Sequence, residues 1–600
     1  MPVKYAKAKY KMTSAVENTD GGDKAGGDLP RLCVLKFGSS VLELEEDYPK
    51  VALEIYRHIR NGEKVVAVVS ALAGQTDQLL NQAQRVGGDG APDALVARVA
   101  RVGELHSAAL LALALSKVGL RSCTLDPHEM ALKAEGTPLD SNLLDLDGES
   151  VWEKIHANDV VVVPGFIADH DDHGVVTLGR GGTDLSAVFF AAKLDAHRVR
   201  LIKDVDGVYA EDPARNPDAE RFSQMSYAEA ERASNGLIQV KAIHEAKADD
   251  VLIEIACLGS AEATKIGNFR ARKSKPLKGD RLRVSLLGCG SVGAGVLDYL
   301  KSQPELFEIG PVLVRRPARY GTDLRFTSDV DEVLGFEPDV LVEVLGGPDL
   351  PAEWMRHSLL QGAHVVTANK AAVAKHWDSL HACALRGGGE LRFSAAVGGG
   401  APIIETLRRL SGSVVSLEGV MNGTCNYLLS RLGEGWKLED ALKKAQELGY
   451  AEADPAADLD GDDAAQKLSI LIREAFGVAL QPERIAKQSL RDLAPGAARE
   501  ALERGEALKQ VGRCHLLADG SIDAEVRLVA LPLSHSLAGA QNEENRFLVT
   551  DADGKTLPVF GKGAGRWPTA TSVFADVMDA QRALLGREPA ALGEVVKLTA

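Results

Sequence analysis

Short apolar runs alternate with longer segments of helical periodicity in the first half of the chain. From Arg31 onward the runs LCVLKFG, KVVAVVSAL, DVVVVPGFI and VRLIKDV are separated by segments such as DALVARVARVGELHSAALLALALS. Buried strands that alternate with helices are typical of a mostly parallel sheet with helices on both faces. The pattern therefore predicts an α/β domain over residues 29–267. Residues 1–28 have almost no apolar periodicity, and we expect a disordered tail there.

The alternating pattern is interrupted once and then restarts. The basic stretch NFRARKSKPLKGD, residues 268–280, contains Pro and Gly, and we expect it to be a flexible linker. The strand RVSLLG then begins a second α/β unit, which continues through VLVRR, DVLVEVLGG and AHVVTANK to about residue 400. Residues 401–575 mix helical segments with segments that are typical of antiparallel strands, such as AEVRLVALPL. This mixture predicts an α+β domain.

Composition narrows the class of protein. A chain of 600 residues exceeds what one core supports, so we expect two to four domains. The net charge of −16 argues against nonspecific nucleic-acid binding. The seven cysteines are scattered without metal-ligand spacing and are typical of reduced thiols in a cytosol. We find no apolar run of bilayer length and no signal-peptide pattern, which predicts a soluble cytoplasmic protein that binds no membrane.

A glycine-rich turn opens the second α/β unit. Gly288, Gly290 and Gly293, with Ser291 and Val292 between them, follow the strand RVSLLG and begin a helix. This is the context of a dinucleotide-binding fingerprint, in which glycines let pyrophosphate approach a helix N-terminus. The alternative is a structural turn. In this position the motif favours a Rossmann domain over residues 281–400.

The second strand of this unit ends in a pair of basic residues. Where an acidic residue would bind the ribose hydroxyls of NAD, the chain has Arg315 and Arg316. Guanidinium groups can pair with a 2′-phosphate. The sequence therefore favours NADP(H) over NAD(H). The alternative is a solvated basic loop.

An acidic segment follows in the α+β region. GYAEADP, residues 449–455, precedes Asp458, Asp463 and Lys467. Asp463 and Lys467 are four residues apart, so a helix would place them on the same face. A solvated acidic loop explains this spacing poorly. The segment is a candidate catalytic region.

These motifs resemble those of homoserine dehydrogenases over residues 281–590. GCGSVGAGV, VEVLGG, VVTANK, VGGGAPII, MNGTCNYLL, GYAEADPAADLDGDDAAQKL and GKGAGRWPTATSV all occur in family order. The resemblance implies NAD(P)H-dependent reduction of aspartate semialdehyde to homoserine, a step of threonine and methionine biosynthesis. It also implies that residues 576–600 form a C-terminal helix that returns to the Rossmann domain.

The resemblance assigns roles to residues of the second half. Lys370 and Lys467 would supply positive charge and a proton where the aldehyde oxygen becomes an alkoxide, and either could be the donor. Glu452, Asp458 and Asp463 would bind the substrate ammonium and hydroxyl groups, and Thr367 would contact the cofactor.

Two positions depart from the family. A monovalent cation is implied near the Val397 backbone, but the Tyr-Glu pair associated with it is Phe393-Ser394 here, so this metal site stays open. Lys562 in GKGAG replaces a common proline, which should alter charge near the cofactor more than shape.

Two glycine-containing segments of the first half suit phosphoryl transfer. Lys36 ends a strand before Gly38, Ser39 and Ser40, and GRGGTD, residues 179–184, follows a later strand. Phosphoryl transfer requires positioned charge, and a lysine, a backbone N–H cradle and a carboxylate are its expected parts. Plain glycine turns are the alternative for each segment.

Together with VVSALAGQTD, VGELHSAAL, VPGFIA and KDVDGVYAEDP, these segments resemble aspartate kinase of the amino acid kinase family over residues 31–267. The resemblance implies an αβα sandwich that uses ATP with Mg²⁺. Lys36 and Asp184 would act on the phosphates, with Gly38, Ser39, Gly181 and Gly182 around them. Aspartate would be held by Ser70, Thr76, Glu104 and Arg180, and the nucleotide by Asp204, Tyr209 and Arg215.

The first half also departs from its family. KFGSSV is one residue shorter than the usual KFGGTSV, NGLIQVKAI stands in place of GAKVLHP, and Lys203 replaces a threonine. The regulatory pair of ligand-binding domains is missing, so feedback inhibition through such domains is not expected.

Three hypotheses remain from the sequence. The chain is a working bifunctional enzyme, or a homoserine dehydrogenase whose kinase-like half is a binding or assembly module, or another Rossmann dehydrogenase. Function resides in the site and not in the fold, so fold alone does not separate them. In each case we expect small-molecule substrates and a homo-oligomer formed through the dehydrogenase half.

Overall fold

The computed structural model describes residues 31–584, except residues 214, 217, 235, 261, 275–280, 449, 452 and 453. The expected tail, most of the C-terminal segment 576–600 and the end of the expected linker thus lie outside the described residues. The described residues from Arg31 onward group into one compact unit by their internal contacts.

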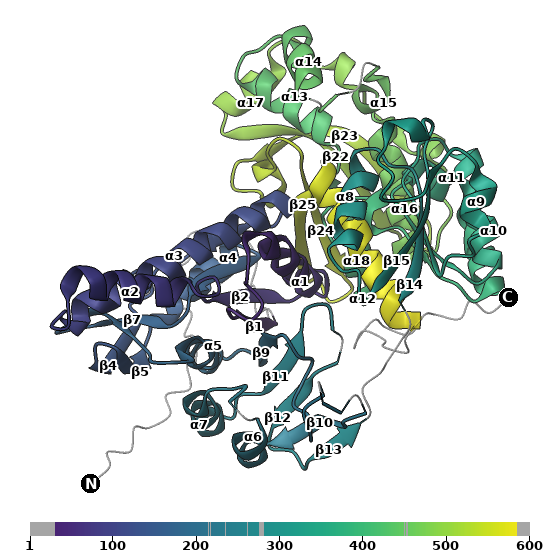
Figure 1. Ribbon diagram of the computed structural model, residues 1–600. Coiled ribbons are helices and arrows are strands. Elements are labelled where there is room, and N and C mark those ends of the chain that lie inside the picture. The colour runs from purple at the N-terminus through teal and green to yellow at the C-terminus, as the bar shows by residue number, and fades with distance from the viewer. Residues whose placement is uncertain are drawn as a thin grey trace. The chain divides into compact units, whose positions relative to one another are not determined.

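A nine-stranded sheet forms the centre of the first half (Figure 1). In spatial order its strands are β13 (Arg272–Ser274), β10 (Arg221–Ser226), β12 (Thr264–Gly267), β11 (Ile253–Cys257), β9 (Arg198–Lys203), β1 (Leu32–Phe37), β2 (Lys64–Val69), β6 (Val160–Pro164) and β3 (Ser122–Thr124). Strands β11, β9, β1, β2, β6 and β3 are mutually parallel. Their apolar runs are buried on both faces, as the uninterrupted valines and leucines predict.

Helices cover both faces of this sheet and make the predicted sandwich. They are α1 (Tyr48–Arg60), α3 (Asp93–Val118), α4 (Gly148–Ala157), α5 (Gly182–Lys193), α6 (Tyr227–Ala233) and α7 (Val240–Asp249). Helix α2 (Gln75–Gly87) packs on α3. One core layer joins α1 and α3 to the sheet and the other joins α4, α5 and α7 to it. A small sheet, β5 (Asp140–Asp145), β4 (Lys133–Thr137), β7 (Ile167–His170) and β8 (Gly174–Thr177), lies beside it.

Part of the expected linker is a strand. β13 pairs in antiparallel fashion with β10 and so extends the first sheet into residues 268–280. The Pro/Gly content of this stretch concealed the strand, because pairing with β10 depends on residues that are distant in sequence. The next strand begins at Leu282, eight positions after Ser274, which leaves no space for a regulatory domain between the halves.

Helix α3 is the one described helix whose length and mean hydropathy would allow it to cross a bilayer. The sequence pattern predicts no apolar run of bilayer length, and helix α3 differs from that expectation. In the structure α3 packs against α1, α2, β6 and β8, and it buries Glu104 within the fold. A core helix of a globular domain meets the same criteria, so we interpret α3 as a core helix.

The second half begins with a six-stranded parallel sheet in the order β16 (Phe326–Thr327), β15 (Phe307–Leu313), β14 (Leu282–Leu287), β17 (Val340–Glu343), β18 (His364–Thr367) and β19 (Leu391–Arg392). Its helices are α8 (Ser291–Lys301), α9 (Val330–Leu334), α10 (Asp349–Leu360) and α11 (Lys370–Gly387). The order reverses around β14, so β14 ends at the crevice where dinucleotides bind in such sheets. This is the predicted Rossmann architecture.

The α+β region has a mainly antiparallel sheet, in which only the short β21 pairs in parallel among the described strands, confirming the predicted class. Its strands are β21 (Ala486–Lys487), β23 (Ile522–Pro532), β22 (Glu506–Leu516), β20 (Val414–Val420), β24 (Glu544–Asp551) and β25 (Thr556–Lys562). The helices are α12 (Ile403–Arg409), α13 (Gly423–Gly433), α14 (Leu438–Glu447), α15 (Ala456–Leu459), α16 (Asp462–Phe476), α17 (Ala497–Glu503) and α18 (Arg566–Leu584). Helix α18 packs on α8 of the Rossmann domain and begins ten residues before the expected boundary at 576.

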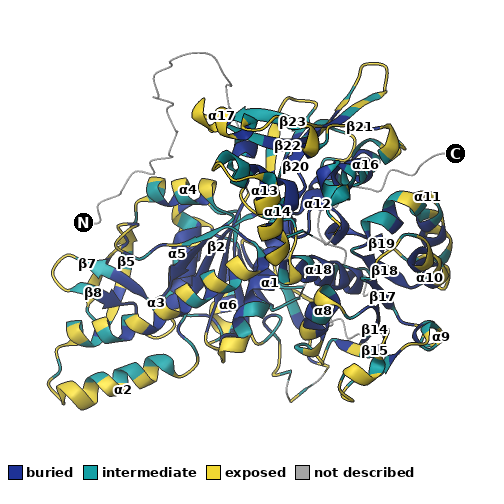
Figure 2. Cartoon of the chain, turned by 90° about the horizontal axis from the view of Figure 1, so that it is seen from above, coloured by how far each residue is buried: buried dark blue, intermediate teal, exposed yellow. Residues whose placement is uncertain are grey.

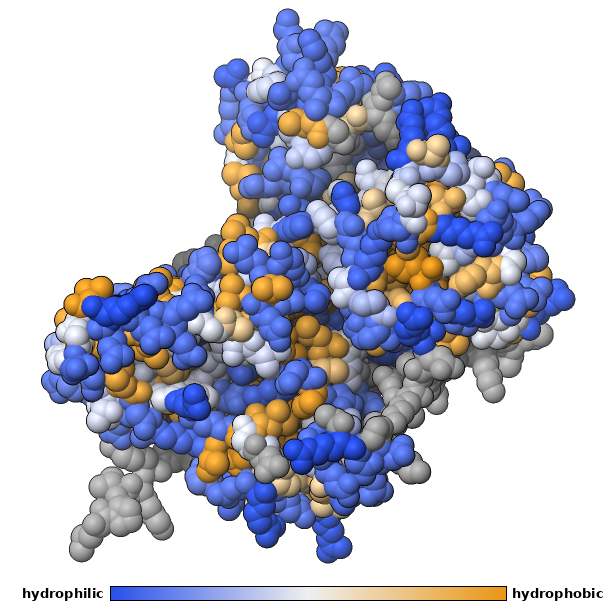
Figure 3. Space-filling model, viewed as in Figure 1, coloured by the Kyte–Doolittle hydropathy of each residue, from blue (hydrophilic) through white to orange (hydrophobic). Residues whose placement is uncertain are grey.

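Burial follows this layering. In Figure 2 the central strands of the parallel sheets, such as β2, β17 and β18, are dark blue, and many exposed positions lie on the outer sides of the helices. Hydrophilic side chains cover most of the face seen in Figure 3, with hydrophobic ones in small groups between them. The polar outer surface agrees with helices that bury one face each.

Candidate active sites

The glycine-rich turn after β14 has the geometry that close phosphate approach requires. Gly288 has a φ of +109°, and Gly290 precedes the first residue of α8, Ser291. A Cβ on Gly293 would lie 2.3 Å from the Gly288 carbonyl oxygen. Side chains at Gly288 and Gly293 would thus crowd the turn, whereas glycines leave the N–H groups of the helix N-terminus accessible.

Arg315 and Arg316 are exposed directly beyond β15, the neighbour of β14. On the other side of β14, Thr367 ends β18 and donates a hydrogen bond of 2.5 Å to Glu343 Oε2. Glu343 is fully buried, and burial raises its pKa. Asn369 donates to the Gly347 carbonyl oxygen at 2.8 Å. Thr367 is itself fully buried, and in this structure its side chain contacts Glu343.

Asp463 joins the two lysines predicted from the sequence. Its carboxylate lies 2.9 Å from Lys370 Nζ and 2.7 Å from Lys467 Nζ. Burial would raise the pKa of Asp463, but the two ammonium groups outweigh it and hold the pKa well below its usual range. Lys370 begins α11 and Asp463 lies in the first turn of α16, so helices from two domains meet here. Two cations face one carboxylate, which leaves positive charge for an oxyanion.

Asn422 completes this cluster and was absent from the sequence prediction. It caps α13 and donates hydrogen bonds to Asp458 Oδ1 at 2.7 Å and to Asp463 Oδ2 at 2.9 Å. Lys467 Nζ also donates to the Met421 carbonyl oxygen at 2.7 Å. The motif MNGTCN carried the signal, because an Asn before a helix is a preferred cap. The predicted Glu452 lies outside the described residues.

In the first half, the structure brings the predicted residues Lys36 and Asp184 together. Lys36 Nζ is 2.8 Å from Asp184 Oδ1, and both side chains are buried. Lys203, the residue that replaces a threonine, joins them with its Nζ 3.0 Å from Asp184 Oδ2. Burial and the Lys36 ammonium lower the pKa of Lys203, although Asp184 opposes them. Two ammonium groups thus meet at the carboxyl ends of β1 and β9, beside the N-terminus of α5.

Other predicted residues surround this cluster. Gly181, with a φ of +79°, and Gly182 begin α5, and Gly38 follows β1. Ser70 donates to Thr183 Oγ1 at 2.8 Å. Glu104 is buried, and burial raises its pKa to about 8, opposed by the Ala71 backbone N–H and by Lys36.

The other predicted residues of the kinase half are exposed or half-buried. Arg180, Asp204, Arg215 and Ser39 are exposed, and Thr76 is half-buried in α2. Tyr209 donates to Asp206 Oδ1 at 2.6 Å. Among the described contacts, none of these residues touches the Lys36–Asp184 pair.

Comparison with known proteins places these sites in families. The model of the amino acid kinase family matches residues 31–250, the NAD-binding domain of homoserine dehydrogenase matches residues 288–394, and the homoserine dehydrogenase model matches residues 402–578. The chain is 35% identical to the homoserine dehydrogenase of Lactococcus lactis over 316 residues, 50% of this chain and 73% of that protein.

The chain belongs to the homoserine dehydrogenase family. It is similarly 36% identical to the Pseudomonas aeruginosa homoserine dehydrogenase over 318 residues, 50% of this chain and 73% of that protein. A solved homoserine dehydrogenase from Thiobacillus denitrificans is 34% identical, with a TM-score of 0.49, covering 51% of this chain and 74% of that one. The kinase domain followed by the dehydrogenase domains fits a bifunctional aspartate kinase–homoserine dehydrogenase.

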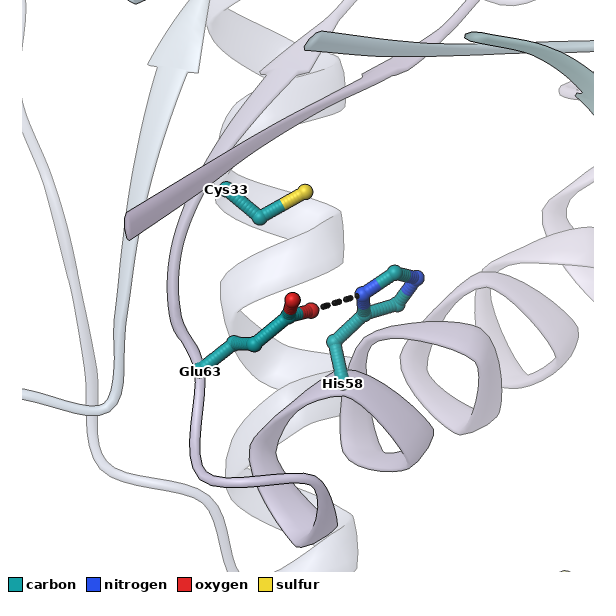
Figure 4. Close-up of side chains that lie close together, drawn as sticks. All are labelled: Cys33, His58 and Glu63. Atoms are coloured by element: carbon teal, nitrogen blue, oxygen red, sulfur yellow. Dashed lines mark hydrogen bonds and ion pairs between the residues drawn. The ribbon is translucent and has the colours of Figure 1, made fainter. Parts of the chain in front are cut away.

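Among the described residues, one further cluster has the chemistry of metal ligands. Cys33 on β1, His58 on α1 and Glu63 lie together and are buried (Figure 4). His58 Nδ1 is 2.6 Å from Glu63 Oε2. Burial would lower the pKa of His58, but hydrogen bonds to Cys33, Glu54 and Glu63 raise it to about 10.

The surroundings of this cluster favour an ion-pair network over a metal centre. A guanidinium nitrogen of Arg198 lies 3.0 Å from Glu63 Oε2 and 3.4 Å from His58 Nδ1. A metal ion would have to lie beside this cation and would need a neutral imidazole. The network instead ties α1 to β9 at the edge of the sheet opposite Lys36.

Proposed function

We propose that the chain reduces aspartate semialdehyde to L-homoserine with NADPH, and phosphorylates L-aspartate with MgATP. The two lysines paired with Asp463 are the observation that supports the first activity. The buried Lys36–Asp184–Lys203 cluster supports the second. The intermediate reduction of aspartyl phosphate would be done by another protein.

In the dehydrogenase site, the chain's own residues would handle charge and protons. A nicotinamide nucleotide bound above the turn at Gly288 would supply the hydride. As the aldehyde oxygen gains negative charge, the ammonium groups of Lys370 and Lys467 stabilise it, and one of them donates the proton. Asp463 holds both lysines, while Asp458, held by Asn422, faces the substrate ammonium.

In the kinase site, Lys36 and Lys203 would neutralise the phosphates during transfer. The N-terminus of α5, opened by Gly181 and Gly182, adds backbone N–H donors. Lys203 supports activity despite the loss of the GAKVLHP segment, because it brings a second ammonium to Asp184 from β9. Glu104 would bind the aspartate ammonium and Arg180 a carboxylate.

The aspartate KM of the kinase reaction should depend on pH through Glu104. Its raised pKa of about 8 means that the empty site holds a neutral carboxyl at pH 7. Binding of an ammonium then requires loss of a proton, so the KM should fall about tenfold per pH unit up to pH 8 and level off above it. Glu104→Gln should raise the KM and remove this dependence. An unchanged KM profile in the variant would show that Glu104 does not bind aspartate.

Cofactor preference should depend on Arg315 and Arg316, which are exposed beside the crevice. Replacing both by serine should lower kcat/KM for NADPH about 10- to 100-fold and leave that for NADH nearly unchanged, since only NADPH carries the 2′-phosphate. Steady-state rates with both cofactors test this. An equal loss of kcat/KM with NADPH and NADH would mean that Arg315 and Arg316 do not bind the 2′-phosphate. Arg319→Ser, in the same turn, is the matched control.

We also propose a cytoplasmic homo-oligomer that associates through the dehydrogenase half, as the family resemblance implies. All seven cysteines are free thiols, which suits a reducing compartment. Light scattering of the purified chain gives the oligomeric state, and a monomer at micromolar concentration would contradict the proposal.

A further inference from the structure

Helix α1 of the kinase half carries an arginine that is buried against the dehydrogenase half. Arg60 is 3% exposed. Its Nε donates to Glu405 Oε1 at 2.8 Å, one terminal nitrogen lies 2.5 Å from Asp576 Oδ1, and the other lies 3.3 Å from Asp579 Oδ2. Glu405 belongs to α12, and the two aspartates belong to α18. One guanidinium from the first half thus faces three carboxylates of the second.

The same guanidinium contacts Ser394, where the family has the glutamate associated with a monovalent cation. Arg60 donates to Ser394 Oγ at 3.2 Å. Ser394 Oγ donates to Asp576 Oδ1 at 2.8 Å, and its backbone N–H donates to Asp576 Oδ2 at 3.0 Å. Ser394 is 2% exposed. A cation ligated at this position would lie beside a guanidinium, and the serine offers no carboxylate. The residues present therefore do not fit a monovalent cation.

Arg60 also contacts residues on both sides of a glycine-rich segment of the dehydrogenase half, residues 397–402. Ser394 precedes residues 397–402, and Glu405 follows them. One turn before Arg60 on α1, Tyr56 donates to the Gly400 carbonyl oxygen at 3.1 Å. Tyr56 and Arg60 are four residues apart and so lie on one face of the helix. The kinase half thus contacts both flanks and the middle of this segment.

The glycine segment in turn touches the second glycine loop, residues 561–565. Gly400 N–H donates to the Lys562 carbonyl oxygen at 2.9 Å. A Cβ on Gly561 would lie 2.5 Å from the Ala401 backbone nitrogen, so the two backbones are in direct contact. The segment before Val397 also packs on β18, the strand that leads to Thr367 and Lys370. A shift of the segment would therefore reach both the cofactor crevice and a catalytic lysine.

We propose that Arg60 is a positioning residue for the dehydrogenase reaction, and that its guanidinium takes the structural place of a monovalent cation beside residues 397–402. The charge comes from the kinase half, so the dehydrogenase site is complete only when the two halves are joined. The kinase half then has a role in the dehydrogenase whether or not it transfers phosphate.

The arrangement predicts that the protein is sensitive to substitution of Arg60. Arg60 is the ion-pair partner of both Glu405 and Asp576. Removing one member of a buried ion-pair cluster leaves uncompensated charge, which is strongly destabilising. Asp579 has a further ion-pair partner, because Arg582 lies 2.6 Å from it. Removal of Arg60 would therefore leave mainly Glu405 and Asp576 without a compensating positive charge.

The first test uses the full-length wild-type chain. Homoserine oxidation with NADP is measured in choline, sodium and potassium chloride at equal ionic strength. The rates should agree within about twofold, because the guanidinium is always charged and covalently present. A wild-type enzyme that needs sodium or potassium for activity would overturn the proposal. A wild-type enzyme that is inactive in all three salts would instead contradict the proposed dehydrogenase function.

The second test uses variants. Arg60→Ala should lower kcat/KM for homoserine at least tenfold and lower the Tm by about 5 °C or more. Arg60→Lys, which keeps the charge, should recover part of both. Lys50→Ala, on the same helix with an ion pair to Asp47 inside the kinase half, is the matched control and should behave as wild type.

A structural role alone would not predict chemical rescue. Low millimolar guanidinium chloride should raise the activity of Arg60→Ala several-fold, and choline chloride at the same concentration should not. If Arg60→Ala keeps wild-type kcat/KM, or if it loses activity that neither guanidinium nor Arg60→Lys recovers, the proposed positioning role is wrong.

Discussion

Asp463→Asn should lower kcat for homoserine oxidation about a thousandfold, with a smaller change in KM. The carboxylate lies within 3 Å of both Lys370 Nζ and Lys467 Nζ, so the substitution releases both ammonium groups from their shared anchor. Charge stabilisation and proton transfer together account for an effect of about this size. Steady-state oxidation of homoserine with NADP at high pH measures it.

The neighbouring residue provides the control. Asp462 lies in the same turn of α16 but is largely exposed and pairs with Lys487 on the surface. Asp462→Asn should retain wild-type kcat and KM, since exposed pairs contribute little. If Asp463→Asn retained more than about a tenth of wild-type kcat, the assignment of this cluster as the catalytic centre would fail.

Asp184→Asn should lower aspartate-dependent ADP formation about a hundredfold or more. Asp184 is buried, and its two oxygens hold Lys36 and Lys203 at 2.8 and 3.0 Å. Without the carboxylate, two ammonium groups face each other in a buried site, so at least one would move or lose its proton. Phosphoryl transfer depends mainly on positioned charge, so the rate of transfer should fall.

Lys193→Ala is the matched control on the same helix. Lys193 ends α5 and pairs with Asp145 at the surface, so it should leave ADP formation unchanged. Dehydrogenase activity measured on the same Asp184→Asn preparation shows whether the chain is folded. Equal loss of both activities would indicate unfolding, and unchanged ADP formation would remove Asp184 from the kinase mechanism.

Local patterns predicted the elements that build both sites. Continuous apolar runs such as KVVAVV and VVVVP identified parallel strands buried on both faces. The turn at Gly288 was predicted because its glycines, the strand before it and the helix after it are adjacent in sequence. Asp463 and Lys467 are one helical turn apart, so their pairing followed from spacing alone.

Contacts between distant residues could not be predicted in this way. Arg60 and Asp576 are 516 positions apart, and no periodicity links them. Lys203 read as a departure from the kinase pattern, yet its side chain reaches Asp184 because β9 lies beside β1. Strand β13 was hidden in a basic Pro/Gly stretch because its partner, β10, lies elsewhere in the chain. Tertiary pairing decides such cases.

The proximity of Cys33, His58 and Glu63 illustrates the same limit. Scattered cysteines and histidines gave no ligand spacing, and the fold nevertheless brings three such groups together. Only the position of Arg198 beside them shows that they form an ion-pair network.

The most direct test of the bifunctional account is aspartate-dependent formation of aspartyl phosphate by the purified wild-type chain, with MgATP, trapped as the hydroxamate. Lys36→Ala serves as the blank. We predict hydroxamate from the wild type and none from Lys36→Ala, with homoserine oxidation present in both. No hydroxamate from a wild-type chain that oxidises homoserine would contradict the account and leave a homoserine dehydrogenase joined to an inactive kinase-like half.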